Sequence, residues 1–102
     1  MRVYGKEIDF KISRLKDAGN FEIALQEMDA KEKEISQYKG PMTGLIEKGI
    51  GMFRDFFVKA TGVDVLEGCD DFNEAKKAYF AFLEEIKMQK AEVLDITAAD
   101  IK

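Results

Sequence analysis

The sequence predicts a mainly α-helical fold, in which a short N-terminal β-hairpin is followed by a three-helix, bundle-like domain. Three observations lead to this fold class. Apolar and charged residues alternate over the first twelve positions, as they do in a half-buried strand. From Ser13 onward the apolar residues recur every three or four positions instead, which is the helical period. Turn-forming pairs at Gly40-Pro41 and Thr61-Gly62 divide this helical part into three segments.

The hairpin is predicted because apolar and charged residues fall on opposite sides of the first segment. Val3, Ile8, Phe10 and Ile12 fall on one side of the alternating segment, and charged residues fall on the other. Gly5 interrupts the alternation at the position where a tight turn needs a residue with positive φ. We therefore expect two short strands with one face on the core.

The first helix is expected to run from Ser13 to about Tyr38. Its apolar residues form a narrow seam of the coiled-coil kind, with Glu32 at one seam position. The members of this seam are Ala18, Phe21, Leu25, Met28 and Ile35.

The second helix is expected to be the central element. Pro41 suits its first position, since proline there loses no helical hydrogen bond, and Gly62 suits its C-terminal cap. Its apolar side chains cover an arc of about 160°, which is wider than one neighbouring helix requires. Two interpretations stay open: the rest of the chain covers the whole arc, or one edge is left for another protein. The arc contains Met42, Leu45, Ile46, Gly49, Ile50, Met52, Phe53, Phe56, Phe57 and Ala60.

Three phenylalanines in this arc point in different directions. Phe53 lies near its centre and is predicted to be a core residue, while Phe56 is expected to pack against the third helix. Phe57 lies toward the opposite edge, near Ile50, and is predicted to face solvent and a partner. The candidate partner-binding residues are Phe57, Ile50, Phe80, Met52 and Met42.

Glycines interrupt the first half of the second helix and lower its helical propensity. Gly49 lies within the apolar arc, where it would admit a close neighbour. Gly44 and Gly51 lie on the polar side, where the sequence offers no packing reason for them. This half of the helix is therefore predicted to be adaptable.

The third helix is predicted to start at Phe72 and to end between Gln89 and Leu94. Asp71 and Glu74 have the spacing of a capping box, and residues 63–71 are expected to be a connection. Leu83 is expected to pack with Phe53 and Phe21, whereas Phe80 lies off the apolar stripe. That stripe consists of Phe72, Ala75, Tyr79, Phe82, Leu83, Ile86, Val93 and Leu94.

Length and composition limit the organisation and the class of function. The 102 residues suffice for one domain, expected over 1–95, with 96–102 as a frayed tail. A net charge of −4 argues against a nucleic-acid partner, because no clustered positive face results. The charged N-terminus and the lack of a long apolar run predict a cytoplasmic protein with no membrane partner.

The residues that usually carry catalysis are scarce. The chain has no histidine, and its single cysteine, Cys69, has no second cysteine or histidine with which to form a disulfide or hold zinc. The acidic pair Asp70-Asp71 is explained by helix capping, and Glu84-Glu85 falls on a solvent face. We therefore expect neither an enzyme nor a cofactor.

Several segments together resemble a known family. The stretches "NFEIALQEM", "FRDFF" and "DDFNEAKKAYFAFLEEI", with the N-terminal hairpin and the turns at Gly62 and Gly68, are similar to small tail-assembly chaperone-like proteins of siphophages and prophages of Gram-positive bacteria. The resemblance covers roughly residues 1–88 and includes the Phe53, Phe56 and Phe57 cluster and the aromatic third helix. It implies a non-enzymatic protein of the bacterial host cytoplasm that binds a helical tape-measure protein through an apolar surface. The alternative is a structural or regulatory protein that forms homo-oligomers through the first-helix seam.

Overall fold

The computed structural model describes residues 1–100, and it describes side chains for residues 1–95. The chain begins with a two-stranded antiparallel hairpin, which consists of β1 (Arg2–Val3) and β2 (Lys6–Glu7). Val3 pairs with Lys6, so the turn consists of Tyr4 and Gly5, and both have positive φ values of 51° and 75°. Two consecutive residues with positive φ make the turn whose twist matches a two-residue hairpin. The predicted hairpin and the role of Gly5 are confirmed, but β2 ends at Glu7, so the buried Ile8 and Phe10 follow the hairpin instead of belonging to a strand.

Three helices follow: α1 (Leu15–Ser36), α2 (Met42–Thr61) and α3 (Phe72–Asp100). The predicted fold class is therefore confirmed. Pro41 is the residue before α2 rather than its first helical residue, and Gly62, at φ 76°, forms the predicted left-handed cap.

The predicted end of α3 between Gln89 and Leu94 is wrong, because the helix continues to Asp100. Residues 91–100 contain neither glycine nor proline, so nothing in the local sequence ends the helix there. Fraying was predicted for residues 96–102. The side chains of these residues, and all of residues 101 and 102, lie outside the described part of the chain.

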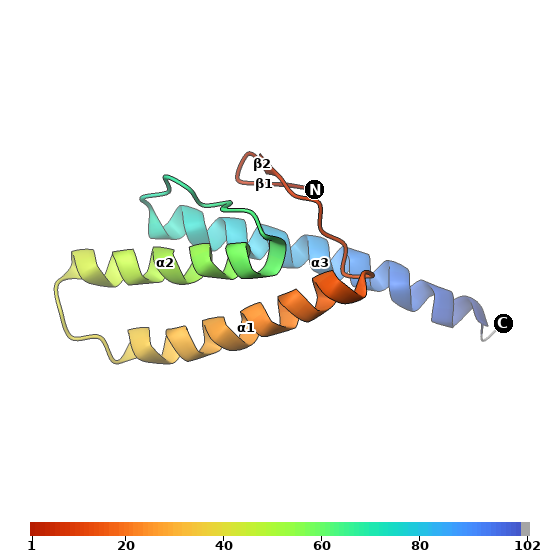
Figure 1. Cartoon of the computed structure of the whole chain (residues 1–102), viewed down its shortest axis with the longest axis horizontal. Coiled ribbons are helices and arrows are strands. Elements are labelled where there is room, and N and C mark those ends of the chain that lie inside the picture. Colours follow the sequence, from red (N-terminus) through yellow and green to blue (C-terminus); the bar gives the residue numbers. More distant parts are fainter. Residues whose placement is uncertain (101–102) are drawn as a thin grey trace.

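Helix α2 lies between the other two helices. Figure 1 shows α1 running antiparallel to α2, whereas α3 runs parallel to it, because residues 62–71 lead the chain back along α2 before α3 begins. The hairpin lies over α3, and the second half of α3 extends beyond α1 and α2 (Figure 1). The molecule is accordingly elongated, with principal extents of 58 × 28 × 20 Å.

Phe82 of α3 lies at the centre of the core. Its ring contacts those of Phe10, Phe21, Phe56 and Phe57, with centroid separations from 5.2 to 6.2 Å. These rings come from the segment after the hairpin, α1 and α2, so one side chain of α3 joins three other segments of the fold. Edge-on contacts of this kind add to the hydrophobic stabilisation that burial provides.

The structure corrects the prediction for Phe57. Phe56 and Phe53 are buried as predicted, but Phe57 is also buried and has no exposed surface. The edge of the arc that was assigned to solvent is covered by Phe82, whose ring centroid lies 5.4 Å from that of Phe57. Phe57 is therefore a core residue and not a partner-binding one.

Helix α3 departs from its predicted packing at two places. Leu83 is only partly buried, and the Phe53 ring contacts those of Phe72 and Tyr79, whereas the Phe21 ring contacts those of Phe10, Phe56 and Phe82. Val93 and Leu94, which were placed in the buried stripe, are exposed because α1 and α2 do not extend that far along α3.

The core also contains residues that periodicity did not select. Val65 and Leu66, in the connection between α2 and α3, are completely buried. In α1 the buried residues are Phe21, Ala24 and Met28, whereas Leu25 is only partly buried. The connection is thus part of the core and not a surface loop alone.

Candidate partner-binding surface

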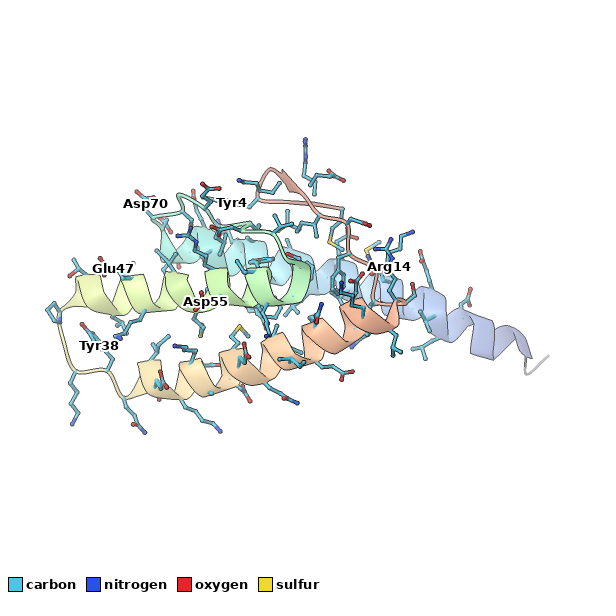
Figure 2. The ribbon with its side chains drawn as sticks, viewed as in Figure 1. Tyr4, Arg14, Tyr38, Glu47, Asp55 and Asp70 are labelled. Carbon is cyan, nitrogen blue, oxygen red and sulfur yellow. The ribbon has the colours of Figure 1, made fainter. Side chains whose placement is uncertain are left out.

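A mainly apolar surface groove lies between α2 and the connection that leads to α3. It encloses about 490 Å³ and is open to solvent. Its lining residues are Thr43, Ile46, Glu47, Ile50, Gly51, Arg54, Cys69 and Asp70. Figure 2 labels Glu47 on the α2 side and Asp70 on the connection. We call this feature the α2 groove.

A strip of three aliphatic side chains runs along α2 into this groove. Met42, Ile46 and Ile50 are spaced by four residues, so they share one face of the helix. Met42 is 67% exposed and Ile46 is 37% exposed, while Ile50 is partly buried against the core. The strip therefore offers apolar area to another molecule while its inner end is fixed by packing.

The opposite wall of the groove is held in place by burial and by an ion pair. Val65 and Leu66 anchor the connection in the core. Arg54 of α2 donates hydrogen bonds to both carboxylate oxygens of Asp64, with 2.8 Å from Nε to Oδ1. These hydrogen bonds lower the pKa of Asp64 and raise that of Arg54, since they favour the charged forms. The groove is therefore preformed rather than bordered by a loose loop.

The charges at the rim of the groove are mainly negative. Glu47 and Asp70 form no ion pair within the described part of the chain, whereas the guanidinium of Arg54 is matched by Asp64. A rim with two free carboxylates favours basic groups on whatever molecule lies in the groove.

A second hollow, of about 290 Å³, lies between α1 and α2 near their connection. Its residues include Ile35, Tyr38, Lys48 and Met52, and the ammonium of Lys48 lies 5.7 Å from the centre of the Tyr38 ring. Figure 2 shows Tyr38 between the end of α1 and the start of α2. The hollow is polar over half of its lining, which distinguishes it from the α2 groove.

The position of Tyr38 gives a packing reason for Gly44, for which the sequence offered none. A β-carbon on Gly44 would overlap the Tyr38 hydroxyl, and the same holds for Gly40. Gly44 therefore allows this close approach, and a larger residue there would displace the Tyr38 hydroxyl. Gly49 is confirmed as a contact point, because a β-carbon there would lie 2.7 Å from the Phe72 ring. Gly51 has open space around it.

The five candidate residues from the sequence do not form one surface. Ile50 lies in the α2 groove and Met42 continues the same strip, but Met52 lies on the other side of α2, in the hollow beside α1. Phe80 is half exposed on α3, and Phe57 is in the core. Ile46, which was part of the predicted arc but not a candidate, belongs to the groove. Its spacing of four from both Met42 and Ile50 is the signal that would have selected it.

The α1 seam, predicted as a possible self-association surface, is used within the chain. Phe21 and Met28 are buried, and the Phe21 ring contacts those of Phe56 and Phe82. Self-association through this seam would require the core to open.

The Asp71 carboxylate accepts hydrogen bonds from the backbone N–H groups of Asn73 and Glu74, at 2.8 and 3.2 Å, which confirms its capping role. Within the described residues, no cluster of three or more potential metal ligands occurs. None of the helices described has both the length and the apolar composition that crossing a bilayer requires.

Comparisons of the chain with family models, with curated proteins and with solved structures find no significant match.

Proposed function

We propose that this protein is a non-enzymatic binding protein of phage or prophage tail assembly, which shields a helical segment of a tape-measure protein in the host cytoplasm. The observation that carries the proposal is the aliphatic strip of Met42, Ile46 and Ile50 beside a preformed groove. An amphipathic helix recognises a groove of this kind by inserting side chains spaced by three or four residues.

The shape and charge of the groove indicate the chemistry of the partner. Aliphatic side chains of the partner would cover Ile46 and Ile50, and Met42 would adapt to different shapes because its thioether chain is flexible. Lysine or arginine residues flanking those side chains would face Glu47 and Asp70. The partner is thus an amphipathic helix with a basic edge.

The identification of this partner as a tape-measure protein rests on the family resemblance of the sequence. A tape-measure protein is long and helix-rich, so its apolar faces need cover until the tail tube assembles around it. A groove that binds successive amphipathic segments would supply this cover.

The test is co-expression with the tape-measure protein encoded in the same tail-gene module, followed by co-purification and measurement of affinity. Ile46→Ser removes an apolar contact from the groove and is expected to weaken binding by about tenfold. Val58→Ser is the matched control, because Val58 is 46% exposed on α2 but lies outside the groove, and it should leave affinity unchanged.

Both variants should keep the wild-type melting temperature to within about 4 °C, since both side chains are partly exposed and to a similar extent. Equal loss of binding in the two variants would show that the groove is not the site. Failure of the wild-type protein to co-purify with the tape-measure protein would contradict the proposed partner.

A further inference from the structure

The outer face of α3 is unpartnered beyond the body of the domain. Five residues, Lys87, Met88, Ala91, Leu94 and Asp95, lie within an arc of about 120° on the side opposite the buried residues Phe82 and Ile86. All five are exposed, and Met88 and Leu94 retain 63% and 67% of their surface. We call this set the α3 outer strip.

The α3 outer strip is complementary to itself when read in the reverse direction. An antiparallel copy centred on Ala91 places Lys87 opposite Asp95, because both are four residues from the centre. The same pairing places Met88 opposite Leu94, each three residues from the centre. In this pairing the basic group of each strip lies at the same height along the helices as the acidic group of the other, and each large apolar group lies at the height of an apolar one.

We propose that the α3 outer strip binds a second copy of this chain, with the two α3 helices antiparallel about a twofold axis at Ala91. A twofold interface requires one patch to match itself, which is the property that the pairing of Lys87 with Asp95 and Met88 with Leu94 has. Ala91 at the centre lets the helices approach closely because its side chain is a single methyl group. Lys87 and Asp95 are free for this role, since neither forms an ion pair within the described residues.

The position of the strip leaves room for the second copy. The core-facing side chains of α3 point away from the strip, and α3 extends beyond α1 and α2 at this end (Figure 1). In the antiparallel pair each domain body therefore lies on the far side of its own helix. The strip has five residues, whereas a standard interface has about 20 to 30 residues on each side, so the dimer should depend on concentration.

The experiment is sedimentation equilibrium of the full chain over a range of concentrations from micromolar to millimolar, at low salt. The wild-type protein should show a reversible monomer–dimer equilibrium. Lys87→Glu should weaken the dimer by about fivefold or more, because it places two acidic groups opposite each other, and Asp95→Lys should do the same with two basic groups.

The double variant Lys87→Glu/Asp95→Lys restores the opposite charges and should recover most of the wild-type dimerisation. Lys77→Glu is the control, since it reverses an exposed charge on α3 outside the strip and should leave the equilibrium unchanged. Circular dichroism should show wild-type helicity for all four variants. A protein that stays monomeric throughout, or a double variant as weak as the single ones, would overturn the proposal.

Discussion

The two halves of α3 share one periodicity but have different surroundings. From Phe72 to Ile86 the apolar stripe is buried against α2, the hairpin and the connection, with Phe82 at the centre of the core. From Lys87 to Asp95 the helix continues without a break, yet Val93 and Leu94 are exposed. The periodicity of apolar residues in the sequence therefore identifies which side of a helix is apolar. Whether that side is buried depends on how far the neighbouring elements extend.

The largest difference in the free energy of unfolding is expected between variants of Phe82, in the first half of α3, and Leu94, in the second half. Phe82→Ala should lower the free energy of unfolding by about 3 to 5 kcal/mol, because the side chain is fully buried among four other rings. Leu94→Ala should change it by less than about 0.5 kcal/mol. Urea denaturation of dilute protein measures both values. A large loss at Leu94 would show that the second half of α3 contributes to the core.

A second contrast concerns how closely α2 approaches the first half of α3. Gly49→Ala should destabilise the protein by about 1 to 3 kcal/mol, since the added methyl group would overlap the Phe72 ring. Gly51→Ala adds the same group in open space and should stabilise the helix by up to about 1 kcal/mol. Thermal denaturation of the two variants gives the comparison. Equal effects would mean that α2 and α3 are farther apart at Gly49 than the structure shows.

A third contrast concerns Gln89, which ties α3 to the segment that follows the hairpin. Its side-chain oxygen accepts a hydrogen bond of 2.8 Å from the backbone N–H of Ile12, and its amide lies 3.4 Å from the carbonyl oxygen of Phe10. Gln89→Ala should cost about 1 to 2 kcal/mol by leaving the partly buried Ile12 donor without this partner. Lys90→Ala is the neighbouring exposed control. Hydrogen exchange at the Ile12 amide should rise in the Gln89 variant alone, and an unchanged rate would place the end of the packed region elsewhere.

Local chemistry made much of the fold predictable. The hairpin was predicted from the alternation of apolar and charged residues and from Gly5. The start of α3 was predicted from Asp71 and the end of α2 from Gly62. Phe53 was predicted to be a core residue because it lies at the centre of the apolar arc. Each of these features depends on residues that are close in sequence. The predicted apolar arc of α2 also contained Met42, Ile46 and Ile50, although only Met42 and Ile50 were candidates for partner binding.

The remaining features depend on contacts between distant segments. Phe57 lies at an edge of the arc, and only the position of Phe82, from another helix, determines that this edge is covered. Val65 and Leu66 belong to a segment with no regular period, so their burial follows from the return of the chain along α2. The groove itself requires two walls, and the sequence identified only the α2 wall.

The hydrogen bonds between Gln89 and the segment after the hairpin have a consequence for synthesis of the chain on the ribosome. They join residues that are 77 and 79 positions apart, and Phe82 is needed to cover Phe10, Phe21, Phe56 and Phe57. The nascent chain must therefore emerge at least as far as Gln89 before these rings are shielded and held in place. During that interval the rings are accessible to other nascent chains, so the speed of translation over α3 sets how long the chain is vulnerable to aggregation.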